Sequence, residues 1–276
     1  MAPASELWVG YFYPETYDPV REDGTLRNLL GERDPGVLAS KEYARTTRRQ
    51  RELLSGDVDV PRTFDADHLR SIHRHLFQDV YEWAGQFRTV PIYKPEGAGF
   101  ASLRDGSVER YLADARRLVE ATPWEHLNRA DFGERAATVF AYLNQAHPFR
   151  EGNGRTSKVF MEHVAERSRF TLDYDRVSPR QWNNASALSG TDLGAYEPWP
   201  ESLVPVFRAI AADRALATAA GPDTTSQTRS ALSASLPAVR HRGDPQDPAQ
   251  HAPGTPQRPH HTRSVPGDRT RLRGTP

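Results

Sequence analysis

Residues 131–167 read DFGERAATVFAYLNQAHPFREGNGRTSKVFMEHVAER. Apolar residues recur every three or four positions on both sides of a short turn that contains one proline and two glycines. This spacing is typical of amphipathic helices, so we expect one helix from Asp131 to about Ala146 and a second from about Gly154 to Arg167. A helix–turn–helix of this kind favours a helical fold.

The same periodicity predicts helices at 35–55, 65–77, 103–121, 179–188 and 200–219. One segment differs. Residues 87–100 read FRTVPIYKPEGAGF, in which Val90, Ile92 and Tyr93 flank a turn rich in proline and glycine, as in a short β-hairpin. We therefore predict an all-α bundle with one hairpin flap.

Composition excludes several classes of protein. The 276 residues contain 36 Lys and Arg, 36 Asp and Glu, and no cysteine. The absence of cysteine excludes disulfides, thiol nucleophiles and thiolate metal sites, and the charge balance gives no general reason to expect a nucleic-acid or membrane partner. No apolar run reaches the length of about 20 residues that a membrane span needs, and residues 1–19 do not resemble a secretory signal. We expect a cytoplasmic protein.

Composition also marks a domain boundary near residue 220. Residues 221–276 contain nine of the 22 prolines and no aromatic residue. A segment of this kind buries too little apolar surface to offset ordering entropy of about 1–2 kcal/mol per residue. We expect a folded domain at 1–220 and a disordered tail rich in Pro, Arg and His at 221–276.

The turn and the start of the second helix, residues 147–158, concentrate chemistry. His147 is a candidate general base, and Glu151 is a hard oxygen ligand suited to Mg²⁺. The glycine-containing turn opens a helix whose N-terminal N–H groups attract phosphate. Two cations, Arg155 and Lys158, stand three residues apart, so we expect them on one helix face, holding phosphate oxygens. Each feature alone is common in loops and solvated helices, but together they indicate a hydroxyl attacking a nucleotide phosphate.

The stretch HPFREGNGR resembles the Fic motif, His-x-Phe-x-Asp/Glu-Gly-Asn-Gly-Arg-x-x-Arg, at every defined position but the last. The resemblance covers roughly residues 17–215 and includes the segment VYEWAGQFRTV at 80–90. It implies the Fic fold and the transfer of AMP from ATP to a hydroxyl of a target protein.

The resemblance also implies a role for each motif residue. His147 would deprotonate a Tyr, Ser or Thr hydroxyl, and Glu151 would bind Mg²⁺. Phe149 would be an anchor in the core. The remaining motif residues would hold the phosphates, with the Asn153 side chain on the α-phosphate: Gly152, Asn153, Gly154, Arg155 and Lys158.

The motif limits the reaction in two ways. Lys158 stands where the family has arginine, and lysine keeps the charge but lacks the planar fork that grips two oxygens, so a looser γ-phosphate contact is expected. Gly154 stands where the Doc-like kinases have lysine, which favours AMP transfer over phosphate transfer. Transfer of UMP or phosphocholine, or a catalytically idle module that only binds a target, are the alternatives.

Regulation and target follow from the resemblance alone. The family's inhibitory pattern, Ser/Thr-x-x-x-Glu-Gly/Asn, is absent from the chain. In the family that absence accompanies a separate small antitoxin, so we expect a toxin with such a partner. Relatives of this branch modify type II topoisomerases, which makes those proteins the analogous target.

Three further groups of residues have two interpretations each. Tyr93, Lys94 and Phe100 are candidates for docking a target by β-augmentation, or they belong to a hairpin that covers the core. Trp182 and Tyr196 either grip an adenine or pack in the core. The cluster His68, His73 and His75 suggests a metal, but its spacing does not align all three on one helix face, so a structural role is expected.

Overall fold

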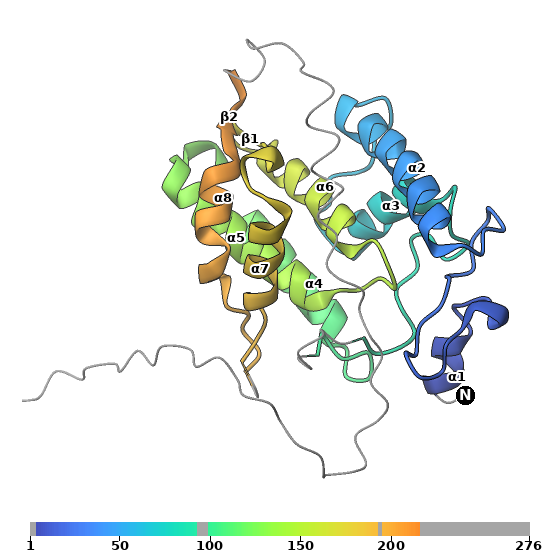
Figure 1. Ribbon diagram of the computed structural model, residues 1–276. Helices are drawn as coiled ribbons and strands as arrows, with labels where there is room; N and C mark the ends of the chain where they lie inside the picture. Colours follow the sequence, from blue (N-terminus) through green and yellow to red (C-terminus); the bar gives the residue numbers. More distant parts are fainter. Residues whose placement is uncertain (1–3, 93–98, 193–194, 216–276) are drawn as a thin grey trace, which may run out of the picture. The chain divides into compact units, whose positions relative to one another are not determined.

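The computed structural model describes residues 4–92, 99–192 and 195–215, all within one unit of the chain (Figure 1). The predicted tail at 221–276 lies outside these residues. Helices predominate, and eight α-helices are formed in the described chain. In chain order they are α1 Ala4–Val9, α2 Pro35–Ser55, α3 Ala66–Phe77, α4 Ser107–Ala121, α5 Arg129–Ala146, α6 Asn153–Ala165, α7 Pro179–Leu188 and α8 Val204–Ile210.

Helix α5 is the centre of the bundle. It packs most extensively on α4 and α8, and it also contacts α6 (Figure 1). Its buried residues cover most of the helix circumference, from Phe132 near the start to Ala146 at the end, and one stripe through Glu134, Thr138 and Tyr142 is exposed or half-buried. A helix buried over most of its surface is held by packing, and α5 therefore gives a fixed support to the turn that follows it.

Side-chain caps explain where several helices begin. Asp34 accepts a hydrogen bond from the Val37 N–H, and Pro35 occupies the first helical position of α2, as predicted. Asp65 caps α3 in the same way, and Asn128 caps α5. Ser178 and Gln181 form a reciprocal capping box at α7. The predicted α5 and α6 therefore exist, and each of their four ends lies within two residues of the one expected.

The C-terminal helix expected at 200–219 is shorter than predicted. A 3₁₀ turn, Pro200–Ser202, precedes α8, and after Ile210 the chain becomes extended. Strand β2, Ala211–Asp213, pairs antiparallel with β1, Phe170–Leu172, with Thr171 opposite Ala212. Pairing between segments distant in sequence overrides the helix propensity of this alanine-rich stretch, and periodicity alone does not detect it.

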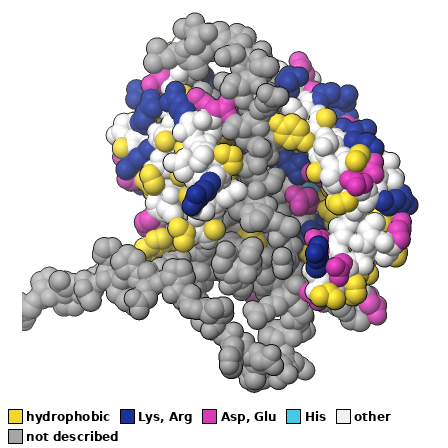
Figure 2. Space-filling view, in the orientation of Figure 1, with side chains coloured by type: hydrophobic (Ala, Val, Ile, Leu, Met, Phe, Trp, Pro, Cys, Tyr) yellow, Lys and Arg dark blue, Asp and Glu magenta, His cyan; other side chains and the backbone are white. Residues whose placement is uncertain are grey.

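The described surface carries both charges intermingled, without one dominant acidic or basic face in the view shown (Figure 2). This distribution agrees with the equal numbers of acidic and basic residues. Among the described helices, none has the combination of length and apolar character that crossing a bilayer requires.

Candidate active site

His147 ends α5 and starts the motif turn. Its backbone is left-handed, with φ 39° and ψ 57°, and its N–H donates to the Leu143 carbonyl at 3.1 Å. Histidine is one of the residue types enriched in this region. The side chain is 4% exposed, and its ring stacks on Phe100 with 3.7 Å between centroids. Arg88 fixes the backbone by donating from Nε to the His147 carbonyl at 2.8 Å. The imidazole is thus held by packing and by its own backbone.

Phe149 and Asn153 close the turn on itself. The Phe149 ring is buried and stacks on His73 at 3.8 Å. The Asn153 Oδ1 accepts from the Phe149 N–H at 2.8 Å, and Asn153 Nδ2 donates to the Phe149 carbonyl at 2.7 Å. One N–H of the amide and its oxygen are therefore used within the turn. The contact of the Asn153 side chain with an α-phosphate stays a prediction, for which the second Nδ2 proton and the backbone N–H are the donors.

Gly152 has two reasons to be glycine. Its φ is 83°, a conformation that side chains disfavour, and a Cβ placed on it would lie 2.3 Å from the Phe77 Cζ atom. The carbonyl of Gly152 accepts the first intrahelical bond of α6, from the Thr156 N–H at 3.0 Å. Close contact with α3 therefore sets where α6 begins.

The start of α6 is open to an anion. No side chain caps it. Because the first intrahelical donor is Thr156, the N–H groups of Asn153, Gly154 and Arg155 have no acceptor within the helix. A helix of 13 residues also places partial positive charge at this end. The turn thus leaves these N–H groups available to an anion, and its phosphate-binding role stays a prediction.

A narrow cleft beside this helix end joins the candidate base to the candidate anion site. His147, Asn153 and Gly154 line it together with side chains of α5 and α7, among them Phe140 and Trp182. Its volume is about 10 Å³, room for about one water, whereas sites for small molecules usually measure hundreds of Å³. A nucleotide must therefore widen this cleft or bind mainly at its mouth.

Arg155 points away from the cleft, toward α2. Its Nη2 lies 2.5 Å from the Glu42 Oε1 and 3.4 Å from the Glu151 Oε1, and Nη1 donates to Thr46 at 3.3 Å. Tyr81 donates its hydroxyl proton to the other oxygen of Glu42. Burial opposes the charge of Arg155, but the two carboxylates outweigh it and raise the pKa of the guanidinium above its ordinary value.

Lys158 lies in a different environment, so the two cationic side chains do not converge on one site as their spacing led us to expect. Its side chain is buried with Nζ 4.7 Å from the centre of the Trp182 ring and 4.9 Å from that of Tyr174. Burial lowers the pKa of Lys158 to about 7, against the opposing effect of Asp175. Arg155 contacts α2 and Lys158 contacts α7, because tertiary partners and not helical spacing decide where these long side chains go.

The Glu151 carboxylate is accessible to a metal ion that arrives with a substrate. Its side chain is 38% exposed, and Oε1 accepts from the Gly152 N–H at 2.9 Å. In the described chain no three His, Asp or Glu side chains gather into a metal site. Magnesium often binds through one or two carboxylates and the phosphates of its nucleotide, so a single half-exposed carboxylate fits an ion that arrives with the nucleotide.

The three histidines of α3 have separate structural partners. His68 Nδ1 accepts from the Phe64 N–H at 3.1 Å, so its Nε2 proton is donated to His163 Nδ1 at 2.9 Å. His73 Nδ1 accepts from the Gly85 N–H at 2.8 Å, so its Nε2 donates to the Glu151 carbonyl at 3.0 Å. His75 pairs with a glutamate of α2. The structural role expected for the cluster agrees with these contacts.

The aromatic pair considered for adenine binding packs in the structure. Trp182 is 3% exposed and lies edge-on to Phe140 at 5.0 Å. Tyr196 stacks on Tyr111 at 4.5 Å and donates to the Asp114 Oδ2 at 2.5 Å. These contacts favour the core interpretation, although Trp182 also forms one wall of the cleft.

The flap prediction is described only in part. Tyr93 and Lys94 lie outside the described residues. Phe100 is buried against the His147 ring, which favours the interpretation that it covers the core over the interpretation that it docks a target. Arg88 joins the two ends of the flap by donating to the carbonyls of Val90 at 3.0 Å and Ala101 at 2.5 Å.

An N-terminal arm, residues 4–13, supports the site and was not anticipated. Trp8 and Phe12 pack with Val90, Ile92 and Phe100 in a second apolar cluster. The buried Arg150 guanidinium lies 4.1 Å from the Trp8 ring centre, and its Nε has no hydrogen-bond partner in the described chain. The aromatic run WVGYFY at 8–13 is the sequence signal for this contact.

Glu42 was also missed by sequence reasoning. In α2 the buried positions are Leu38, Glu42, Thr46, Gln50 and Leu53, so polar residues occupy the middle of an inward face. Buried polar groups need partners. That stripe was the available signal for a polar network, and its partner is Arg155.

Comparison with known proteins identifies the family. The family model for the Fic/DOC family matches residues 63–165. Protein adenylyltransferase VbhT of Bartonella schoenbuchensis is 37% identical over 64% of this chain, which spans 37% of the length of VbhT. "Probable protein adenylyltransferase y4lH" of Sinorhizobium fredii is 36% identical over 64% of this chain and 90% of its own length.

A solved structure gives the same picture. The N-terminal Fic domain of a VirB-translocated Bep effector protein from Bartonella quintana, with bound ADP, superposes with a TM-score of 0.60 and 28% identity. The match covers 74% of this chain and 95% of that domain. With a relative matched over nine-tenths of its length and the motif turn held between α5 and α6, the chain belongs to the Fic/DOC family.

Proposed function

We propose that this protein is an adenylyltransferase that moves AMP from ATP to a hydroxyl of a target protein. The observation that carries the proposal is the cleft in which His147 faces the uncapped start of α6. Relatives named protein adenylyltransferase, and a Fic domain crystallised with ADP, support it.

The reaction follows from the positions of these groups. The target hydroxyl oxygen forms a bond to the α-phosphorus, the bond from that phosphorus to the bridging oxygen of the β-phosphate breaks, and pyrophosphate leaves. His147 accepts the hydroxyl proton. The N–H groups at the start of α6 stabilise the negative charge that develops on the α-phosphate oxygens. Glu151 would hold a magnesium ion that arrives with the nucleotide, and the ion would neutralise charge on the leaving pyrophosphate.

The two cations contribute unequally in this proposal. Arg155 already forms an ion pair with Glu42, so it acts on phosphate oxygens only by sharing its charge with that carboxylate. Lys158 lies buried on Trp182 and needs the cleft to widen before it meets a phosphate. We therefore assign most of the anion binding to the backbone N–H groups.

The proposal extends to a toxin-type role with a separate inhibitory partner. Its support is that the printed sequence has no Ser/Thr-x-x-x-Glu-Gly/Asn pattern of its own. Type II topoisomerases remain the target by analogy. Co-expression of the chain with a cognate small protein carrying that pattern should relieve any growth arrest, and an arrest that persists equally with His147→Ala would contradict an enzymatic toxin.

Isotope position separates the candidate activities. The chain is incubated with a cell extract and with ATP labelled on either the α- or the γ-phosphate, beside His147→Ala. His126→Ala is the matched control, because its side chain is 78% exposed. We expect protein labelled from the α position only, in the wild type and the control, and none with His147→Ala. Label from the γ position would indicate a kinase, and no label would indicate a binding module.

A further inference from the structure

A second, larger cavity of about 530 Å³ lies where the N-terminal arm meets the segment that enters the flap. Its walls include Glu6, Tyr11 and Tyr13 of the arm, together with Glu82, Trp83 and Thr89. None of these residues lines the cleft beside His147. The cavity is large enough for one or more side chains of a bound polypeptide.

Two walls of the cavity are aromatic and fixed in position. The Tyr11 and Trp83 rings stand at 88° with 6.2 Å between centroids. Trp83 stacks on Tyr81 at 4.2 Å, and the Tyr11 hydroxyl lies 3.2 Å from the Thr89 Oγ1. Rigid aromatic faces of this kind bind a partner at low entropic cost, and they attract cations.

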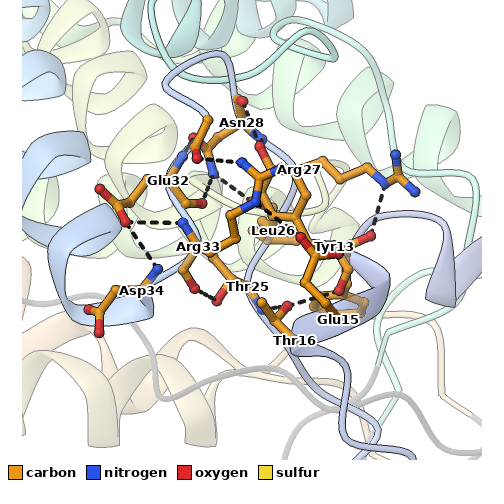
Figure 3. Close-up of polar contacts among 12 residues, drawn as sticks. Tyr13, Glu15, Thr16, Thr25, Leu26, Arg27, Asn28, Glu32, Arg33 and Asp34 are labelled. Atoms are coloured by element: carbon orange, nitrogen blue, oxygen red, sulfur yellow. Dashed lines mark hydrogen bonds and ion pairs between the residues drawn. The ribbon is translucent and has the colours of Figure 1, made fainter.

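The charges of the cavity favour a cation as well. In the described chain neither Glu6 nor Glu82 forms an ion pair, so both carboxylates are available. One cation, Arg27, also lines the cavity, but its Nε already donates to the Phe12 carbonyl at 2.9 Å. Figure 3 shows its long side chain leaving the polar network that holds the loop at residues 13–34. Two carboxylates and one exposed guanidinium thus line the cavity.

The cavity also borders the segment that leads into the flap. Thr89, in its wall, directly precedes Val90, where the described part of the flap begins to pack on the arm. A polypeptide that lies along the flap with its hydroxyl near His147 would therefore pass the cavity. We propose that this cavity is a second docking site for the protein substrate, and that it takes a Lys or Arg side chain from the segment that carries the modified hydroxyl. This inference rests on the proposed AMP transfer.

Binding of small peptides tests the cavity without relying on activity. The full chain is titrated, by NMR observation of the peptide, with acetyl-Gly-Lys-Gly-amide and with the same peptide carrying norleucine. We expect millimolar binding of the lysine peptide, at least fivefold weaker binding of the norleucine peptide, and weakening at 0.5 M NaCl. Glu82→Gln should weaken the lysine peptide about threefold, and adding Glu6→Gln should weaken it further.

The control is Glu125→Gln, an exposed carboxylate elsewhere on the surface, which should leave binding unchanged. Equal binding of the two peptides, or no effect of either cavity substitution, overturns this inference. Transfer of α-label to protein is measured in parallel on the same samples. Absence of α-label with intact lysine selectivity would overturn the proposed activity and leave a cation-binding cavity, so the two failures are distinguishable.

Discussion

The contact between Gly152 and Phe77 predicts a large cost for the smallest substitution, Gly152→Ala. The new methyl carbon would lie 2.3 Å from the Phe77 Cζ atom, far inside van der Waals contact, and φ is 83°. The left-handed backbone alone costs about 1–2 kcal/mol for alanine. Overpacking in a full core adds about 1–3 kcal/mol, so we expect a loss of about 2–5 kcal/mol in the free energy of unfolding.

Gly56→Ala is the matched control. Gly56 ends α2 with φ 80°, but nothing lies within 4 Å of the added methyl group, so only the backbone term applies. Urea titration measures both variants, with unchanged m values as the sign that the folded state is comparable. Because α6 starts at this contact, Gly152→Ala should also reduce α-label transfer at least tenfold, as a displacement of about 1 Å would. A Gly152→Ala protein no less stable than Gly56→Ala would refute the reasoning.

Three further predictions follow from the same contacts. Lys158→Arg should increase turnover of ATP, because the forked guanidinium grips two oxygens; turnover equal to or below that of the wild type would contradict this. Asn153→Ala should lower the free energy of unfolding in urea by about 1–3 kcal/mol, because it leaves the Phe149 N–H and carbonyl without these partners. Gln86→Ala is the control, because Gln86 is exposed; Asn28→Ala is unsuitable, because the Asn28 amide also holds a loop. Burial lowers the pKa of His68 to about 4 and that of His163 to about 3, so as the pH falls below 6.5 these histidines bind protons in the unfolded chain before they do so in the folded chain. The free energy of unfolding should therefore be highest above pH 6.5 and fall by roughly 1 kcal/mol per histidine between pH 7 and 5.5. An unfolding free energy of the wild type that does not change over that range would count against this prediction.

The motif turn was readable from the sequence because its determinants are local. Periodicity located the flanking helices, and the glycines and Pro148 located the turn between them. The long, specific motif supplied the family. A helix start and the N–H groups it exposes follow from backbone geometry alone, which is why the sequence could locate the uncapped start of α6.

The directions of the long side chains could not be predicted in the same way. Arg155 and Lys158 share a helix face by spacing, yet Glu42 in α2 draws one and Trp182 in α7 surrounds the other. The pairing of β1 with β2 likewise depends on contacts between distant segments. No local pattern contains that information, because the partners are set only when the helices pack.

The N-terminal arm is an intermediate case. Its aromatic run was visible, but only the fold shows that Trp8 packs on Arg150 within the motif turn. The same packing places Phe100 over His147. The arm is therefore coupled to the site through residues that the motif itself does not define.

A crystal structure with a non-hydrolysable ATP analogue and Mg²⁺ tests the central claim most directly. The account predicts phosphate oxygens within hydrogen-bond distance of the N–H groups of Asn153, Gly154 and Arg155, the α-phosphorus facing His147, and a cleft wider than the present 10 Å³. A nucleotide bound elsewhere, with those N–H groups still turned toward protein or water, would contradict it.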